Sequence, residues 1–183
     1  NVKTAINAGI GLVPEDRKQS GIYPIQGIRF NATIEILDKF LKKGRYNRKK
    51  EIELARKYVD EVMQTRYSSI EQEIGKLSGG EKRRLYLLRI LMEAPNVLIL
   101  DEPTSMLDVS VQAQVMTLLK ELQEKLGLSY LFISHDLDVV RWFCDEVAVM
   151  EEGKFVETGR TEDVIGYPKA EFTKRLVENF ILE

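Results

Sequence analysis

The sequence predicts an α/β fold in which helices cover a parallel sheet, together with a predominantly helical region. Three observations lead to this expectation. Residues 20–93 carry apolar side chains mainly at helical spacing. Residues 97–100 and 130–133 are short, continuous apolar runs, and an amphipathic helical pattern over residues 109–126 separates them. Strand–helix–strand alternation of this kind is typical of a parallel sheet with helices on its faces.

The first part of the chain is expected to contain one strand followed by helices. Residues 8–13 predict a strand that ends at Pro14. Asn31 is a candidate N-cap of a helix that closes at residues 42–44 (KKG), and a second helix is expected over residues 48–64. The apolar faces consist of Ile34, Leu37 and Leu41 in the first helix, and of Ile52, Ala55, Val59 and Val62 in the second.

The remaining elements follow from residue 97 onward. The run at 97–100 predicts a strand buried on both faces. The helix over 109–126 is expected to end at Gly127, and residues 130–133 predict a second buried strand. The apolar stripe of that helix is Val111, Val115, Leu118, Leu122 and Leu126. A short helix (136–144), a hairpin (147–157, with its turn at 151–153) and an amphipathic helix (169–182) complete the chain.

Composition and charge exclude some classes of protein. The 183 residues carry a formal net charge of −2, which gives no reason to expect a nucleic-acid binder driven by bulk charge. The single cysteine, Cys144, cannot form an intrachain disulfide and suits an intracellular setting. No apolar run is long enough to span a bilayer. Because the chain does not start with methionine, we expect it to be part of a longer protein.

Two adjacent glycines stand at the start of a strong helical pattern, in residues 78–81 (SGGE). Ser78 and Glu81 have the spacing of a capping box, which by itself indicates only a well-capped helix. A cap does not need two glycines. Backbone N–H groups without neighbouring side chains at a helix N-terminus form an anion site, so Gly79 and Gly80 also indicate a phosphate site.

Carboxylates and the only histidine follow the two apolar runs. Asp101 and Glu102 come directly after residues 97–100, at the end of a strand where open parallel sheets bind ligands. One carboxylate there can hold Mg²⁺, and its neighbour can polarise a water molecule. His135 follows residues 130–133 in the same way. If the two strands are neighbours, these side chains share one crevice.

The order of these motifs across residues 77–136 resembles that of ATP-binding cassette (ABC) ATPases. The resemblance implies a P-loop NTPase fold with a helical subdomain, ATP as substrate and Mg²⁺ as cofactor. It divides the chain into the end of the core sheet (1–19), a helical subdomain with the signature motif (20–93) and an α/β core (94–183). It also implies a second ABC ATPase domain as partner, because in the family the signature motif faces ATP held by that partner.

The resemblance further implies roles for individual residues. Glu15 stands where the family usually has a glutamine, which puts its contact with nucleotide and magnesium in question. Glu81 also replaces a glutamine, and little change is expected because both residues serve in a capping box. The remaining roles are nucleotide contact for Ser78, Gly79, Gly80 and Glu81, magnesium binding for Asp101, general base for Glu102, coupling of the two nucleotide sites for Asp108, and contact with the γ-phosphate for His135.

One family motif is missing from the sequence. A G-x-x-x-x-G-K-[ST] segment, the Walker A loop that cradles phosphates, does not occur. In the family this loop precedes the glutamine position that Glu15 occupies. We therefore expect a C-terminal portion of an ABC ATPase domain, with an incomplete sheet and poor binding of MgATP.

The resemblance is spread over several ABC groups. Residues 13–17 are similar to the second ATPase half of sugar importers, and residues 77–84 to ribosome-acting ABC-F proteins. Residues 108–114 and 131–137 are similar to the ATPases of oligopeptide, dipeptide and nickel importers. Residues 105–108 (SMLD) count against an ABC-F protein.

Two classes of function stay open, with a third for the chain alone. The first is an ATPase at the cytoplasmic face of the membrane that drives import of peptides or a similar small solute, its helical region docking on a transmembrane permease. The second is a soluble ABC ATPase, similar to ABC-F proteins or to the activation component of methyl-coenzyme M reductase. Nucleic acid is an expected partner only in the ABC-F case. The third is a non-catalytic fragment that associates with a partner domain.

Overall fold

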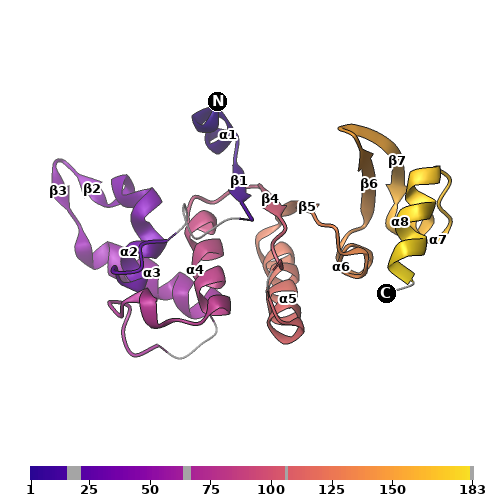
Figure 1. The fold of residues 1–183 in the computed structure, drawn as a ribbon. Coiled ribbons are helices and arrows are strands. Elements are labelled where there is room, and N and C mark those ends of the chain that lie inside the picture. The colour runs from indigo at the N-terminus through magenta and orange to yellow at the C-terminus, as the bar shows by residue number, and fades with distance from the viewer. Residues whose placement is uncertain (16–21, 64–66, 106, 182–183) are drawn as a thin grey trace. The chain divides into compact units, whose positions relative to one another are not determined.

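The computed structural model describes residues 1–15, 22–63, 67–105 and 107–181. They belong to two compact units, Asn1–Leu131 and Phe132–Glu183. The first unit contains a sheet and most of the helices, and the second contains a hairpin with three short helices (Figure 1). Among the helices in these ranges, none is long and apolar enough to cross a membrane.

The first unit alternates helices with short strands. Its elements are α1 (Val2–Asn7), β1 (Ile10–Val13), α2 (Ile28–Thr33), the 3₁₀ helix η1 (Ile34–Phe40), β2 (Leu41–Lys42), β3 (Arg45–Tyr46), α3 (Arg48–Met63), the 3₁₀ helix η2 (Ile74–Lys76), α4 (Gly79–Leu91), β4 (Val97–Asp101), α5 (Val109–Leu126) and β5 (Ser129–Ile133), whose last two residues belong to the second unit.

The sheet has the strand order β1-β4-β5. Strands β1 and β4 are parallel, with Val13 opposite Leu100, which confirms the predicted parallel core. Both side chains line a small internal cavity with Leu87 of α4 and Leu118 of α5. The apolar core of this unit therefore lies between one face of the sheet and these two helices.

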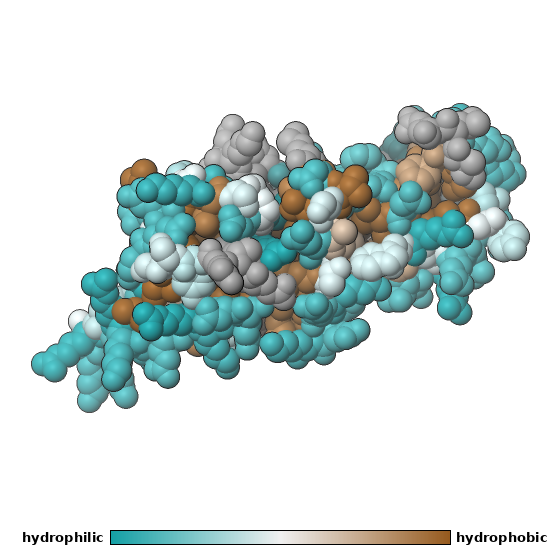
Figure 2. Space-filling view, turned by 90° about the horizontal axis from the view of Figure 1, so that it is seen from below, coloured by the Kyte–Doolittle hydropathy of each residue, from teal (hydrophilic) through white to brown (hydrophobic). Residues whose placement is uncertain are grey.

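The other face of the sheet is less covered than the sequence indicated. The prediction that residues 97–100 are buried on both faces is wrong, because only Leu98 and Leu100 are buried and their neighbours are half-buried. Leu12 on β1 is 53% exposed and Leu131 on β5 is 55% exposed. Helices α4 and α5 pack on the face that carries Val13 and Leu100. Figure 2, a view of the chain from below, shows hydrophobic residues at the surface between hydrophilic ones.

Helix α5 closely follows its prediction. It begins after the cap Asp108 and ends at Gly127, whose φ of +66° is the left-handed conformation expected of a C-terminal glycine. Val115, Leu118 and Leu122 are buried as expected. Leu126 is 46% exposed, so the stripe reaches the surface in the last turn.

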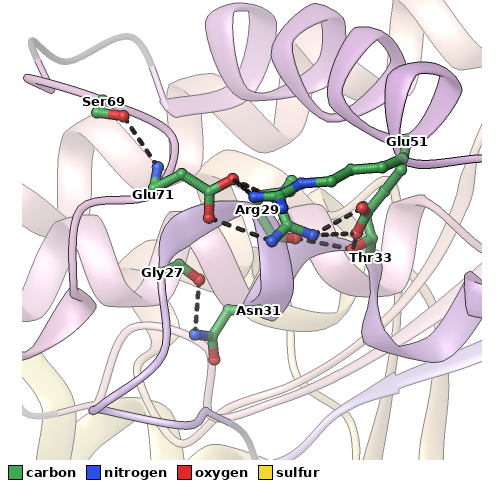
Figure 3. Close-up of polar contacts among 8 residues, drawn as sticks. Gly27, Arg29, Asn31, Thr33, Glu51, Ser69 and Glu71 are labelled. Carbon is green, nitrogen blue, oxygen red and sulfur yellow. Dashed lines mark hydrogen bonds and ion pairs between the residues drawn. The ribbon is translucent and has the colours of Figure 1, made fainter.

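The predicted cap at Asn31 is wrong. Asn31 lies inside α2, where Gly27 is the N-cap, and its side chain is fully buried. Its Oδ1 accepts a hydrogen bond from the backbone N–H of Tyr23 at 2.7 Å, and its Nδ2 donates to the carbonyl of Gly27 at 3.0 Å (Figure 3). The amide thus pairs backbone groups of a neighbouring loop, as buried polar groups require.

The expected helix end at residues 42–44 is a β-hairpin instead. Residues 34–40 form η1, whose helical geometry is interrupted at Ile36. The chain then reverses between β2 and β3. Lys43 and Gly44 in the turn have φ values of +49° and +74°. Two consecutive positive φ values produce the tight turn that suits the twist of a two-stranded hairpin.

A buried ion pair joins the helices of this region. Arg29 of α2 donates from Nη1 to both carboxylate oxygens of Glu51 of α3, at 2.7 and 2.6 Å, and from Nε to Glu71 at 2.7 Å (Figure 3). Thr33 donates to Glu51 at 2.6 Å. Glu51 is fully buried. The hydrogen bonds to Glu71 and then Glu51 hold the pKa of Arg29 above its ordinary value.

The second unit confirms the predicted hairpin and adds a helix. Its elements are α6 (Leu137–Phe143), β6 (Glu146–Glu151), β7 (Lys154–Arg160), α7 (Thr161–Gly166) and α8 (Glu171–Ile181). Helix α7 was not expected from the sequence. It buries Val164 against the hairpin, where Gly159 leaves room for it. Glu157 of β7 accepts hydrogen bonds from the N–H groups of Lys169 and Ala170, at 2.9 and 3.0 Å, just before α8.

Replacement of Glu51 by glutamine should lower the free energy of unfolding by about 3–5 kcal/mol, since Arg29 would lose its buried counter-charge. Glu71→Gln is the matched control. It removes a second carboxylate from the same guanidinium, but its side chain is 44% exposed, so about 1 kcal/mol or less is expected. Urea unfolding measures both. Equal losses in the two variants would contradict a dominant role for the buried pair.

Acid should weaken the second unit partly through Glu157. The N–H groups of Ala170 and Lys169 hold the pKa of this carboxylate below its ordinary value. A depressed pKa means that its stabilisation is present above the ordinary pKa of about 4.3 and is lost as the pH falls through the folded-state value. Wild type should therefore lose more stability than Glu157→Gln between pH 7 and pH 3.5. Urea unfolding followed by the fluorescence of Trp142, the only tryptophan, tests this, and identical pH dependences would contradict it.

Candidate functional site

The turn before α4 has the predicted capping box. The Ser78 hydroxyl accepts a hydrogen bond from the N–H of Glu81 at 3.3 Å, and the Glu81 carboxylate accepts from the N–H of Ser78 at 2.8 Å. The same carboxylate accepts from the Ser78 hydroxyl at 2.8 Å. Both residues are therefore locked to each other at the start of the helix. We call residues 78–81 the signature turn.

The two glycines of the signature turn differ in their surroundings. A β-carbon on Gly79 would meet nothing within 4 Å. A β-carbon on Gly80 would come within 2.8 Å of Cγ1 of Val111 on α5. Gly80 is thus required by the close approach of two helices, whereas no neighbouring atom requires Gly79. The β-carbon position of Gly79 is open, and the phosphate site predicted there stays a prediction.

The end of β4 holds the two acidic residues in an unusual turn. Asp101 is the last residue of the strand, and Glu102 follows with a φ of +43°. A positive φ is uncommon for a residue with a β-carbon and costs of order 1–3 kcal/mol, a strain that clusters at functional sites. Ser105 supports the turn, because its N–H and hydroxyl donate to the carbonyl of Glu102 at 3.2 and 3.0 Å.

Two arginines fasten the signature helix α4 to the segment that follows β4. Arg83 donates from Nη2 to the carbonyl of Ser105 at 3.1 Å. Arg84 is 8% exposed and donates from Nη2 to Oε1 of Gln114 on α5 at 3.0 Å. The sequence analysis did not single out either arginine. The available signal was their position. They follow the signature turn by two and three residues, on a helix whose other buried residues are mainly apolar.

Glu15 lies at the same edge of the sheet as Asp101 and Glu102, which we call the β4 acids. It follows β1 by two residues, and β1 runs parallel to β4. Carboxyl ends of adjacent parallel strands meet at one edge, where ligands of open α/β sheets bind. The structure therefore brings Glu15, Asp101 and Glu102 to a common edge, and the side chain of Glu15 is exposed there.

The acidic edge suits a magnesium ion that arrives with phosphates. Within the described ranges, no group of three or more histidine, cysteine, aspartate or glutamate side chains is placed to hold a metal ion. Mg²⁺ is commonly held by one or two carboxylates together with substrate phosphates and water. A half-buried Asp101 at the strand end fits that mode of binding, and an all-protein cage is not formed.

Asp108 and His135 lie at the starts of two further helices. Asp108 is exposed and caps α5, its Oδ1 accepting from the N–H of Val111 at 3.0 Å. His135 belongs to the second unit, is exposed, and lies between β5 and the α6 cap Asp136. Asp136 accepts from the N–H of Val139 at 3.1 Å. The structure thus shows a local capping role for Asp108, while the family roles of both residues stay predictions.

Comparison with known proteins identifies the family of this chain. A family model described as "ABC transporter" matches residues 3–105, which is more than half of the chain. The chain belongs to the ABC transporter family. The match includes the signature turn and both β4 acids.

Curated relatives of this ABC chain are ATP-binding proteins of transporters. It is 47% identical over 117 residues to the oligopeptide transport ATP-binding protein OppD of Mycobacterium tuberculosis, a match that covers 64% of the chain and 19% of the relative. It is 51% identical over 100 residues to the dipeptide transport ATP-binding protein DppF of Haemophilus influenzae, covering 55% of the chain and 31% of the relative. The chain thus spans less than a third of the length of either relative.

A solved structure confirms the predicted P-loop NTPase fold. CbiO1 of Clostridium perfringens superposes with a TM-score of 0.70 at 27% sequence identity, over 97% of this chain and 64% of that one. CbiO1 is part of the ABC transporter complex CbiONQ.

The different surroundings of the two glycines predict different effects of alanine. Gly80→Ala should lower the free energy of unfolding by about 1–3 kcal/mol, because its methyl group overlaps Val111. Gly79→Ala should be neutral or stabilising by up to about 1 kcal/mol, because the site is open and alanine reduces the entropy of the unfolded chain. Chemical unfolding of both variants measures the difference, and a larger loss for Gly79→Ala would contradict the packing of α4 on α5.

Proposed function

We propose that the chain is part of the ATP-hydrolysing subunit of an ABC importer for peptides or a similar small solute. One observation carries the proposal: a helix N-terminus that is open to an anion and an acidic strand end are joined in one unit through the contact of Arg83 with Ser105. ATP hydrolysis needs both kinds of site, one for phosphates and one for magnesium and water. The transported class is inferred from the oligopeptide and dipeptide transport relatives.

The signature turn is assigned to nucleotide held by a second ATPase domain. The N–H groups of Gly79 and Gly80 lie in the first turn of α4, where the helix dipole favours an anion. Ser78 offers a hydroxyl at the same end of the helix. Its hydrogen bond to Glu81 keeps that hydroxyl in place.

The β4 acids are assigned to hydrolysis. Asp101, with Glu15 two residues after the neighbouring strand β1, would hold Mg²⁺, which supplies charge compensation for the phosphates when bound. Glu102 would accept the proton of the attacking water, as general base. Asp108 is proposed to couple the two nucleotide sites, and His135 to contact the γ-phosphate.

The proposed partners follow from the assignment of the chain to an ABC importer. A second ABC ATPase domain would complete each nucleotide site, because in the family one domain supplies the Walker motifs and the other supplies the signature turn. A transmembrane permease would dock on the helical region, residues 20–93, at the cytoplasmic face of the membrane. The description of CbiO1 as part of a transporter complex supports this arrangement.

Titration calorimetry of the 183-residue chain with MgATP tests what the chain can do alone. Without a phosphate-cradling loop, we expect no saturable binding at submillimolar nucleotide. Clear binding would contradict this expectation, and a phosphate site would then have to lie among the residues present here.

Glu102→Gln in the intact parent protein tests the catalytic assignment. Loss of a general base typically costs about 10²–10⁴ in rate, so turnover should fall at least a hundredfold. ATP binding should persist, since the amide retains the size of the side chain. Glu124→Gln, at an exposed position of α5, is the matched control and should leave turnover unchanged. Normal turnover of Glu102→Gln would remove Glu102 from the catalytic role.

A further inference from the structure

A dense group of positive charges lies on residues 41–50, which we call the basic hairpin. It comprises β2, β3, their turn and the start of α3. Every one of its ten residues is exposed. Six of the ten are basic, namely Lys42, Lys43, Arg45, Arg48, Lys49 and Lys50.

Little nearby charge neutralises the basic hairpin. The flanking acids in the sequence are Asp38 and Glu51. Glu51 is fully buried and engaged by Arg29, so it does not face the hairpin's solvent-exposed side. Among the residues that the structure describes, one of these six side chains forms an ion pair. Arg48 pairs with the half-exposed Glu71 at 3.5 Å. Because the whole chain has a net charge of −2, the rest of it is distinctly acidic.

Two apolar side chains accompany these charges. Leu41 and Tyr46 are directly opposite each other in the hairpin and are 56% and 45% exposed. Lys42 and Arg45 form the neighbouring pair, and adjacent pairs of a hairpin point to opposite faces. The hairpin therefore carries an apolar pair on one face and the basic pair Lys42 and Arg45 on the other.

The base of the hairpin is firmly anchored. Phe40, directly before β2, is 2% exposed, and its carbonyl accepts from the N–H of Asn47 at 2.9 Å. Partial burial and a hydrogen bond to Glu51 raise the pKa of Tyr46 to about 12. In Figure 1, β2 and β3 project from the helices α2 and α3 at the end of the unit away from β1 and β4.

We propose that the basic hairpin binds the anionic phospholipid headgroups of a membrane surface. Clusters of four to eight lysine and arginine residues bind such surfaces, and tyrosine and leucine can enter the interface beside the headgroups. A single-stranded nucleic acid would need several aromatic rings on which bases can stack, whereas Tyr46 is the only aromatic residue of the basic hairpin. The setting of this contact, next to a permease, rests on the proposed function.

Vesicle cosedimentation of the 183-residue chain, without nucleotide, tests the proposal at about 0.15 M salt. The vesicles are pure phosphatidylcholine, or phosphatidylcholine with a third of phosphatidylglycerol. Wild type should bind the anionic vesicles and not the neutral ones. The variant K42Q/K43Q/R45Q should bind roughly a hundredfold more weakly, at about tenfold or less per charge removed. Leu41→Ser should bind severalfold more weakly with its charge unchanged. Circular dichroism checks that each variant is folded.

The control removes the same charge elsewhere on the first unit. K3Q/K57Q/K125Q changes three exposed lysines outside the hairpin and should bind as wild type does. Equal loss in this control would overturn the proposal, because binding would then depend on bulk charge alone. Equal binding to neutral vesicles would also overturn it. Binding of a short single-stranded RNA that is lost in K42Q/K43Q/R45Q, without vesicle binding, would reassign the surface to nucleic acid.

These outcomes are separate from those for ATP hydrolysis. Vesicle binding uses no nucleotide and none of the residues assigned to catalysis. If wild type does not bind the anionic vesicles while Glu102→Gln lowers turnover as expected, only the membrane contact is overturned. Normal turnover in Glu102→Gln with intact vesicle binding would remove only the catalytic assignment.

Discussion

Burial of helix α4 is the constraint on which the first unit depends. Leu85 and Leu88 are completely inaccessible to solvent, and α4 packs against α2 and α3 as well as against β1 and α5. A helix enclosed by both the helical region and the sheet cannot shift without opening two interfaces. Its N-terminus, and with it the signature turn, is therefore held at a defined distance from the end of β4. The contacts of Arg83 and Arg84 add hydrogen bonds to this packing.

Charge is used in two different ways within the helical region. Arg29 and Glu51 form a buried pair that joins α2 to α3, where removing either partner would leave an uncompensated charge. The basic hairpin next to it keeps its charges in solvent, where they remain available to a partner. Glu51 links the two, because its carboxylate pairs with Arg29 and its backbone N–H donates to the carbonyl of Asn47 at the base of the hairpin. The rigid pair thus supports the exposed surface.

Local hydrogen-bond patterns were predictable where all partners lie within a few residues. Ser78 with Glu81 and the stop at Gly127 are of this kind, and the structure confirms both. The helix cap predicted at Asn31 is not formed, because its side chain hydrogen-bonds to the backbone of Tyr23 and Gly27 across a turn. A cap and a buried amide have the same local sequence signal. Only the packed loop decides between them, since burial requires the amide to satisfy the nearest free backbone groups.

The sequence by itself determined the order of strands and helices from residue 97 to residue 157, the capping box of Ser78 and Glu81, the helix stop at Gly127, and the motif series by which the family was expected. These depend on periodicity and on neighbours along the chain. The tertiary structure decided which glycine is needed for packing, since Gly80 meets Val111 and Gly79 meets nothing. It also decided that Glu51 is buried and that Arg83 contacts Ser105, residues separated by a strand and two turns. Such contacts arise only when distant segments are brought together, so no local pattern records them.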